Sequence, residues 1–447
     1  MNPDIFKAYD IRGKVGTELT PEVCWSIGQA LADWLPEQGA VAVGRDMRPD
    51  SEEFSKAVIE GLRLQGREVL DIGLVSTDMI YFAVGHLGLA GGAMITASHN
   101  PGDYNGIKIC REEAKPVGID TGLAEIRDMA MAGNFAPSAQ KGELKFREIK
   151  EEWISHALSF VDADSWPNYK IAIDAGNGML GAIAPVLAKQ IPLHITPMFY
   201  ELDGTFPNHP ADARTQEGMA DLQAKVREGD GLDFGIAFDG DGDRAALVDE
   251  KGDLLSGTVM TAILAHYFLK KEPGATILYN ATVGDVVPES VKRAGGTAYR
   301  TKVGNSYIKA KMRAHNAVFG GEAAGHYFFR ENWSADSGLL AAIIAVQVLA
   351  ESGKKLSELA DEFRVYPTIP EAAFVVEDKE AMLDTLRQNF NDGAQDDLDG
   401  VTVRYRDAWF NVRPSNTEPI LRLNVEAKNA EALAALVARV KQVIQQK

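Results

Sequence analysis

Residues 92–108 read GAMITASHNPGDYNGIK, and the rest of the chain is organised around this stretch. Its first four residues form an apolar run, which predicts a short buried strand. The Asn-Pro-Gly and Asn-Gly turn residues that follow strongly disfavour helix. We therefore expect Ser98 where a buried strand ends in a polar loop, with His99 and Lys108 near its hydroxyl. Loops on rigid scaffolds are common places for chemistry, although an ordinary surface turn explains this stretch taken alone.

The composition is that of a globular protein with a large core. The chain has 447 residues, of which 45% are hydrophobic and 25% are charged. By length alone it has roughly three domains. The net charge of −18 disfavours a nucleic acid or an anionic membrane surface as partner. Small phosphorylated substrates remain compatible with this charge, because local clusters of Arg and Lys can override the global sign.

The cysteines and the apolar stretches indicate the compartment. Cys24 and Cys110 are the only cysteines and form no CxxC motif, so a reducing cytosol fits best. The first residues contain no apolar signal core. The apolar stretch 339–350 is too short to span a bilayer and predicts a buried helix. We expect a cytoplasmic protein without a membrane partner.

Short apolar strands alternate with helical segments over most of the chain, which indicates βαβ units and mainly parallel sheets. A polar stretch near residues 136–152 marks the first boundary, and the alternation restarts with a strand at 170–174. After Pro370 short strands lack intervening long helices until 430–446, which is an α+β pattern. The predicted fold is three similar α/β domains with mainly parallel mixed sheets plus a smaller α+β C-terminal domain. The predicted limits are 1–148, 149–251, 252–367 and 368–447.

An acidic loop follows the predicted strand 234–238. Asp239, Asp241 and Asp243 are separated by single glycines, and such a cluster of hard oxygen ligands suits Mg²⁺ or Ca²⁺. Three carboxylates so close repel one another unless a cation compensates them, which disfavours a plain solvated loop. The calcium-loop template also fits in part, with Glu250 at position twelve. It fails because Arg244 stands where that loop needs glycine and because both flanks read as strands.

A second glycine-rich turn matches a different template. Residues 176–181 read GNGMLG after a strand, with Glu201 about twenty residues on, which is the dinucleotide-binding fingerprint. The motif alone is weak, and we favour a glycine-rich structural turn from strand to helix, because sites for phosphoryl chemistry compete for the explanation. A nicotinamide-dependent oxidoreductase therefore stands as a second hypothesis, and a non-enzymatic divalent-ion-binding protein as a third.

Two further polar loops could bind a phosphorylated sugar. Residues 413–419 read RPSNTEP and offer a guanidinium, hydroxyls, an amide and backbone N–H groups, a combination that suits a phosphate dianion. Glu322 and His326 could hold sugar hydroxyls and a proton. An ordinary turn, a surface glutamate and a structural histidine are the alternatives. Each of these loops lies near the end of a predicted strand, where open α/β sheets place ligands.

Together these motifs resemble the α-D-phosphohexomutase family, most closely its bacterial phosphomannomutase/phosphoglucomutase members. The resemblance covers essentially the whole chain in the family's order. Its motifs are YDIRG at 9–13, TASHNP at 96–101, DGDGDR at 239–244, the stretch from Gly321-Glu322 to His326, and RPSNT at 413–417. It implies three α/β domains and a C-terminal domain around one central cleft.

By this resemblance Ser98 carries a phosphoryl group, and Asp239, Asp241 and Asp243 hold Mg²⁺ against it, with Ser98 as a further metal ligand. A phosphoserine adds about −1.5 to −2 charge, which the cation offsets. A sugar hydroxyl would attack the phosphorus to give a hexose 1,6-bisphosphate, which turns end for end and returns its other phosphate to the serine. This implies interconversion of hexose 6-phosphate and hexose 1-phosphate, with the bisphosphate as activator.

The resemblance also suggests roles for other residues. A lysine can act as a base if burial lowers its pKa. The candidate catalytic residues are Ser98, His99, Lys108, Arg12 and His326. The candidate substrate-binding residues are Tyr9, Arg244, Lys302, Gly304, Glu322, His326, Arg413, Ser415, Asn416 and Thr417.

Two departures from the family pattern concern the sugar. Ala324 stands where the family often has a serine, and PNHPAD at 207–212 lacks the usual Pro-Asn-Pro run. Mannose is the first hexose expected and glucose the second. Phosphoglucosamine mutase is the alternative within the family, although such enzymes usually open with a Thr-Asp-Gly-Ile-Arg-Gly type sequence. We expect a monomer or homodimer.

Overall fold

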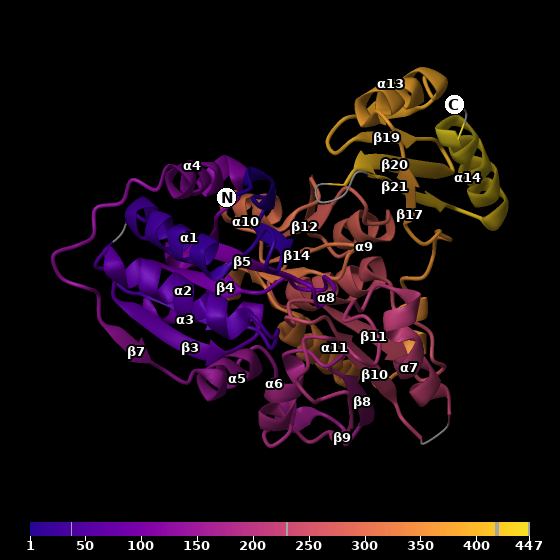
Figure 1. Ribbon diagram of the computed structural model, residues 1–447. Helices are drawn as coiled ribbons and strands as arrows, with labels where there is room; N and C mark the ends of the chain where they lie inside the picture. Colours follow the sequence, from indigo (N-terminus) through magenta and orange to yellow (C-terminus); the bar gives the residue numbers. More distant parts are fainter. Residues whose placement is uncertain (37, 229–230, 416–419, 446–447) are drawn as a thin grey trace.

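The computed structural model describes residues 1–36, 38–228, 231–415 and 420–445. Four β-sheets follow one another along the described chain, each with its own helices. Figure 1 shows the fourth sheet and its two helices, coloured orange to yellow, as a lobe beside the rest of the molecule. The predicted class of three α/β domains and a smaller α+β C-terminal domain is confirmed, whereas the exact domain limits stay predictions.

The first sheet has the order β1-β5-β4-β2-β3-β7, with β6 paired to β5. Strands β2, β3, β4 and β7 are parallel, and β5 runs antiparallel to both of its neighbours in this order. The elements are β1 Ile11–Lys14, α1 Pro21–Trp34, β2 Val41–Arg45, α2 Ser51–Leu64, β3 Val69–Leu74, α3 Thr77–Leu87, β4 Gly91–Ile95, β5 Tyr104–Arg111, β6 Lys115–Pro116, α4 Leu123–Ala132 and β7 Leu144–Phe146.

Local chemistry explains where these helices begin and how they pack. The side chain of Thr20 accepts a hydrogen bond from the backbone N–H of Val23, which caps the start of α1. A Cβ atom at Gly28 would lie 2.4 Å from the carbonyl oxygen of Val58, so only glycine lets α1 and α2 approach this closely. Their apolar faces then close the core of this first unit.

Strand β5 corrects the prediction for the loop that contains Ser98. Asn105 and Gly106, which were predicted to form a turn, lie within β5 and pair with β1. A Cβ at residue 106 would lie 2.2 Å from the carbonyl oxygen of Ile11 and 2.8 Å from that of Thr96. The glycine therefore permits close approach of neighbouring strands, and the polar loop ends before Tyr104.

The second and third sheets have the orders β11-β10-β8-β9 and β13-β12-β14-β15-β16. Each combines a parallel part with antiparallel strands at one edge. Their elements are α5 Lys150–Leu158, β8 Lys170–Asp174, α6 Leu180–Leu187, β9 His194–Met198, α7 Gln216–Arg227, β10 Phe234–Phe238, β11 Ala245–Asp249, α8 Gly257–Lys271, β12 Thr276–Asn280, α9 Val286–Arg293, β13 Thr297–Thr301, α10 Asn305–His315, β14 Phe319–Gly321, β15 Tyr327–Phe329, β16 Ala335–Asp336, α11 Gly338–Ser352 and α12 Leu356–Asp361.

Helix α11 holds these units together. As the apolar stretch 339–350 predicts, it is buried over most of its length. Its side chains join a continuous hydrophobic core that also contains residues of α3, β8, β10 and α8. Among the described residues no helix combines the length and the apolarity that crossing a bilayer requires.

The C-terminal sheet is antiparallel throughout, in the order β17-β21-β20-β19-β18. The prediction that no long helix interrupts its strands is wrong, because α13 spans 11 residues. Its sequence is mostly polar and buries only Leu383 and Leu386, so its apolar stripe is too narrow to stand out. The elements are β17 Ala372–Val375, α13 Lys379–Asn389, β18 Ala394–Asp396, β19 Val401–Arg404, β20 Ala408–Pro414, β21 Ile420–Ala427 and α14 Ala430–Gln445.

Polar pairs join this lobe to the third unit. Arg404 Nη1 lies 2.8 Å from Asp285 Oδ1, and the backbone N–H of Asp285 donates to Glu426 Oε1 at 2.8 Å. Arg300 forms a second ion pair, at 2.7 Å, with Asp396. The lobe is therefore attached mainly through charges and hydrogen bonds rather than through a shared apolar core.

Candidate active site

Ser98 lies just beyond the carboxyl end of β4, and its side chain is buried. Its backbone adopts a positive φ of 54°, which is uncommon for a residue with a side chain and carries strain. The backbone N–H of Ser98 donates to Thr96 Oγ1 at 2.9 Å. In this conformation the Ser98 hydroxyl donates to Asp239 Oδ2 at 3.2 Å, so it points at the acidic loop.

The acidic loop connects β10 to β11, and all three of its carboxylates are buried. One oxygen from each of Asp239, Asp241 and Asp243 lies within 4.8 Å of the others. Asp241 Oδ1 and Asp243 Oδ1 are buried and have no hydrogen-bond partner among the residues that the structure describes. Buried oxygens with free lone pairs are costly unless a cation approaches them, so this donor set fits a hard divalent ion.

The pKa values of the loop lead to the same conclusion. Burial raises the pKa of Asp239 well above its usual value, and the nearby carboxylate of Asp243 raises it further. Burial also acts on Asp243, but the charges of Lys108 and His326 outweigh it and lower that pKa to about 2. Burial together with neighbouring carboxylates of the same charge is the setting in which a bound cation stabilises such a loop.

Lys108 projects from β5 into this loop. Its ammonium lies 2.6 Å from Asp241 Oδ2 and 2.5 Å from Asp243 Oδ2. Burial alone lowers the pKa of a lysine, but these two carboxylates outweigh burial and hold the pKa of Lys108 above its usual value. The condition for this lysine to act as a base, a pKa lowered by burial, is therefore not met in the arrangement described here.

His99 and Arg244 meet beside the serine. Arg244 Nη2 lies 2.5 Å from His99 Nδ1 and 3.3 Å from Ser98 Oγ. Burial holds the pKa of His99 well below its usual value, and the charge of Arg244 lowers it further. Because a guanidinium can only donate, His99 Nδ1 accepts this hydrogen bond and cannot serve as a proton donor at this nitrogen.

The comparisons with known proteins agree with this geometry. Residues 3–136, 151–252 and 256–366 match the phosphoglucomutase/phosphomannomutase alpha/beta/alpha domains I, II and III, and residues 371–443 match the C-terminal domain of the same family. The chain belongs to the phosphoglucomutase/phosphomannomutase family. The recognition from sequence motifs is thereby confirmed.

Individual relatives of this family resemble the chain along its whole length. The phosphohexose mutases of Xanthomonas campestris pv. campestris (strain B100) are 40% identical over 96% of both chains. The phosphomannomutase of Escherichia coli (strain K12) is 36% identical, over 95% of this chain and 94% of its own. The crystal structure of a phosphoglucomutase/phosphomannomutase family protein from Burkholderia thailandensis superimposes with a TM-score of 0.91 at 30% identity, covering 100% of this chain and 98% of that one.

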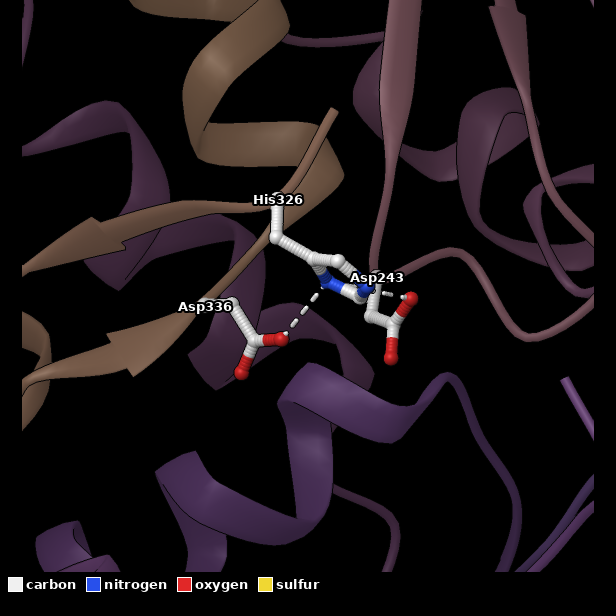
Figure 2. Close-up of side chains that lie close together, drawn as sticks. All are labelled: Asp243, His326 and Asp336. Carbon is white, nitrogen blue, oxygen red and sulfur yellow. Dashed lines mark hydrogen bonds and ion pairs between the residues drawn. The ribbon is translucent and has the colours of Figure 1, made fainter. Parts of the chain in front are cut away.

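In this family member His326 approaches the acidic loop from the third sheet, whereas Lys108 approaches it from the first. It precedes β15, and its Nδ1 lies 3.0 Å from Asp336 Oδ2 and 3.8 Å from Asp243 Oδ1. Figure 2 shows the imidazole between the two carboxylates. These three side chains are close enough to hold a metal ion. However, Lys309 already neutralises Asp336 at 2.7 Å, so we interpret the group as a device that orients His326.

The candidate sugar loops also come together. Glu322 Oε1 accepts a hydrogen bond from the backbone N–H of Gly304 at 3.0 Å, and the hydroxyl of Tyr9 donates to the carbonyl oxygen of Val303 at 3.1 Å. A Cβ at Gly304 would lie 2.4 Å from the Tyr9 hydroxyl, so the contact between these loops requires glycine. Lys302 is exposed, 6.0 Å from the ring of Tyr307.

Arg12 links the YDIRG motif to the serine loop. Its guanidinium pairs with Asp10 at 2.8 Å and donates from Nη1 to Asn100 Oδ1 at 2.5 Å. Asn100 is two residues beyond Ser98, so a cation of β1 is held beside the loop that contains Ser98. This places Arg12 with the other predicted catalytic residues.

The C-terminal phosphate loop is described in part. Arg413 is buried, its Nη2 lies 3.5 Å from Glu371, and its Nε has no hydrogen-bond partner among the described residues. The backbone N–H of Ser415 donates to the carbonyl oxygen of Ile420 at 2.9 Å. Asn416 and Thr417 lie outside the described residues. Burial raises the pKa of Tyr9, and the charge of Arg413 opposes this, so the arginine lies within electrostatic reach of the first unit.

The GNGMLG turn supports the acidic loop instead of forming a cofactor site. The backbone N–H of Met179 donates to the carbonyl oxygen of Gly240 at 2.9 Å, which occupies the start of α6. A Cβ at Gly178 would lie 2.6 Å from the same oxygen, and one at Gly181 would lie 2.1 Å from the carbonyl oxygen of Tyr200. The glycines therefore allow close backbone packing, and the position that a dinucleotide pyrophosphate needs is filled by protein.

Sequence reasoning missed several residues that hold the site. Thr77 Oγ1 donates to Asp241 Oδ2 at 2.5 Å and fixes the acidic loop to α3. Asp336 and Lys309 orient His326, and Arg48 donates to the carbonyl oxygen of Ser98. None of these residues belongs to a recognisable motif, because each contacts a partner far away in the sequence.

Proposed function

We propose that this protein is a hexose phosphate mutase that interconverts hexose 6-phosphate and hexose 1-phosphate through phosphorylated Ser98. The observation that carries this proposal is the 3.2 Å contact between the Ser98 hydroxyl and Asp239 Oδ2. It joins a side chain that can accept a phosphoryl group to a loop that can hold a divalent cation. Relatives named phosphomannomutase and phosphohexose mutase support the same reaction class.

We propose Mg²⁺ as the metal, held by Asp239, Asp241 and Asp243 with an oxygen of the phosphorylated Ser98. When bound, Mg²⁺ supplies positive charge that offsets the phosphoserine and polarises the phosphorus. Lys108 and Arg244 bring two further positive charges to the same place. Such charges stabilise the oxygens of the transferring phosphoryl group.

The transfer step needs a group that receives a proton. The sugar hydroxyl oxygen forms a bond to the phosphorus, the bond from phosphorus to Ser98 Oγ breaks, and the hydroxyl proton leaves. We propose His326 as the acceptor, because Asp336 binds its Nδ1 and so leaves Nε2 available for a proton. In the second half of the reaction the other phosphate returns to Ser98 and the proton to the sugar oxygen.

The remaining predicted residues would bind the substrate. Arg413 and Ser415, with Asn416 and Thr417, would hold the phosphate that is not reacting, in either orientation of the sugar. Glu322, Tyr9, Lys302, Gly304 and Arg12 would contact the sugar or its phosphate. We propose mannose as the preferred hexose and glucose as the second, with a hexose 1,6-bisphosphate as activator.

Labelled glucose 1,6-bisphosphate tests the covalent step. Incubation with Mg²⁺ should label one serine, at position 98, and peptide mass spectrometry will locate it. Turnover of mannose, glucose and glucosamine 1-phosphates is then compared with the bisphosphate added. A protein that takes up no label and turns over none of the three sugars would not be a mutase, and glucosamine preferred over mannose would favour the alternative within the family.

Assembly and location remain part of the proposal. We propose a monomer or homodimer. We propose the cytoplasm as its location, because Cys24 and Cys110 are both buried as free thiols. The domain limits 1–148, 149–251, 252–367 and 368–447 are proposed likewise. Light scattering on the purified protein measures the assembly, and limited proteolysis followed by mass spectrometry locates the linkers.

A further inference from the structure

Arg48 follows β2 and is almost completely buried, with 3% of its surface exposed. Its guanidinium donates hydrogen bonds to four backbone carbonyl oxygens, three in the loop that contains Ser98 and one at the first residue of β5. The acceptors are the carbonyl oxygens of Ser98 at 2.9 Å, Asn100 at 2.6 Å, Pro101 at 2.8 Å and Tyr104 at 2.9 Å. One side chain thus binds the loop at three points and the start of the following strand at a fourth.

Three of these bonds stabilise a segment that lies outside the helices and strands. Residues 96–103 lie between β4 and β5, and Ser98 within them has a strained positive φ of 54°. Such a conformation is strained and persists only where the surroundings determine it. A planar guanidinium with five donors in a fixed geometry can bind several carbonyls at once, which a lysine ammonium cannot do in the same way.

The guanidinium is itself held by a buried network. Arg48 Nε lies 3.3 Å from Asp46 Oδ2, and both side chains are fully buried. Asp46 Oδ1 accepts from Ser51 Oγ at 2.6 Å, and Ser51 Oγ in turn accepts from Asn105 Nδ2 at 3.0 Å. The position of Arg48 is therefore fixed from β2, from α2 and from the start of β5.

Arg48 also contacts the unit that carries the acidic loop. The ring of Phe206 lies 5.1 Å from its guanidinium carbon. A Cβ at Gly240 would lie 3.3 Å from the same ring and 2.7 Å from the carbonyl oxygen of Ser98. Arg48 and Phe206 thus stack where the serine loop and the acidic loop touch, so a shift of the arginine would change the distance between them.

We propose that Arg48 is a positioning residue for phosphoryl transfer, which holds the Ser98 loop in the strained conformation that directs Oγ at the acidic loop. This inference rests on the proposed function. The polar contacts of the Arg48 guanidinium are backbone carbonyls and Asp46, so its effect acts through Ser98. A displacement of about 1 Å in a reacting group can cost about 10²-fold in rate.

The test compares Arg48→Met with the matched control Arg67→Met. Arg67 also donates to carbonyl oxygens of the first unit, those of Ala32 at 2.9 Å and Leu35 at 2.5 Å, but these lie at the end of α1. We expect Arg48→Met to lower kcat about 10²-fold with KM for hexose 1-phosphate changed less than about twofold. Arg67→Met should lose thermal stability but keep its kcat.

Amide hydrogen exchange gives a readout that does not depend on activity. Peptides covering residues 96–104 should exchange faster in Arg48→Met and at the wild-type rate in Arg67→Met. If Arg48→Met does not fold, Arg48→Lys replaces it, because the lysine keeps the pair with Asp46 but loses most of the four carbonyl bonds. Its kcat should fall between those of wild type and Arg48→Met or, where the methionine variant is unfolded, clearly below wild type.

The inference is overturned if the Arg48 variant keeps kcat, or if residues 96–104 exchange equally fast in both variants. A fall in kcat that Arg67→Met shows equally would also overturn it, because general destabilisation would then explain both. If wild-type protein takes no phosphoryl group from the bisphosphate, the proposed function fails instead. The exchange comparison still decides whether Arg48 holds the loop.

Discussion

Lys309 Nζ lies 2.7 Å from Asp336 Oδ1, and neither side chain is exposed to solvent. The ammonium also lies 3.6 Å from the centre of the Tyr81 ring. Asp336 in turn accepts a hydrogen bond from Asn305 Nδ2 at 2.5 Å and lies 3.0 Å from His326 Nδ1. A buried ion pair thus fixes both the histidine and the start of α10, which begins at the predicted substrate loop.

Asp336→Asn is expected to impair both stability and catalysis. The variant leaves the charge of Lys309 buried and unpaired, which costs about 3–5 kcal/mol in the free energy of unfolding. A neutral amide at this position cannot hold the imidazole as the carboxylate does, so kcat should fall. The double variant Asp336→Asn with Lys309→Met should recover stability but not kcat. Urea unfolding and steady-state kinetics measure the two effects, and recovery of kcat in the double variant would contradict the orienting role.

Ser98→Ala should lower kcat by several orders of magnitude, because it removes the oxygen that would carry the phosphoryl group. The variant should take no label from glucose 1,6-bisphosphate. Ser55→Ala is the control, because Ser55 is buried too and its hydroxyl donates to the carbonyl oxygen of Glu52 at 2.9 Å, away from the acidic loop. Near-normal turnover in Ser98→Ala would refute the covalent mechanism.

Mg²⁺ should stabilise the folded protein through the acidic loop. A ligand that binds only the folded state at a hundred times its Kd adds about 2.7 kcal/mol to the free energy of unfolding. Wild type should therefore show a midpoint of thermal unfolding that rises with MgCl₂ concentration. Asp241→Asn should lose this dependence, whereas Asp221→Asn, an exposed residue of α7, should keep it. Equal shifts in both variants would place the cation elsewhere.

Glu426 should make the stability of the protein depend on pH. Burial raises its pKa from 4.5 to about 7, although the hydrogen bonds from the Asp285 backbone and from Trp409 act against this. A carboxyl with a raised folded-state pKa keeps its proton longer in the folded than in the unfolded state. Its contribution is therefore most favourable below about pH 4.5 and is lost as the pH rises through about 7.

Glu426→Gln removes this titration. As the pH rises from about 5 to about 8, wild type should lose this contribution to stability and the variant should not. The difference in free energy of unfolding therefore shifts in favour of the variant, by about 1.4 kcal/mol for each unit of pKa shift. Denaturant unfolding at both pH values measures the difference. Glu431→Gln, an exposed residue of α14, should show no such change between the two pH values. A pH-independent difference between Glu426→Gln and wild type would contradict the prediction.

Much of the fold could be predicted because its determinants are local. Apolar runs such as those in β4 and β10 identify buried strands, and the alternating Asp and Gly residues of 239–243 mark a loop that can surround a cation. Local patterns misled where contacts decide the structure. Asn105-Gly106 is a strong turn sequence, yet it forms part of β5 because neighbouring strands approach it closely.

What the sequence by itself determined was the set of loops that carry chemistry and their order along the chain. Only the tertiary structure decided how these groups behave. The ammonium of Lys108 is held by Asp241 and Asp243, which lie 133 and 135 positions further along the chain, and the loop that contains Ser98 accepts hydrogen bonds from one buried arginine that follows β2. The physical reason is that charge interactions and backbone positioning depend on distances in space, which no local pattern of residues records.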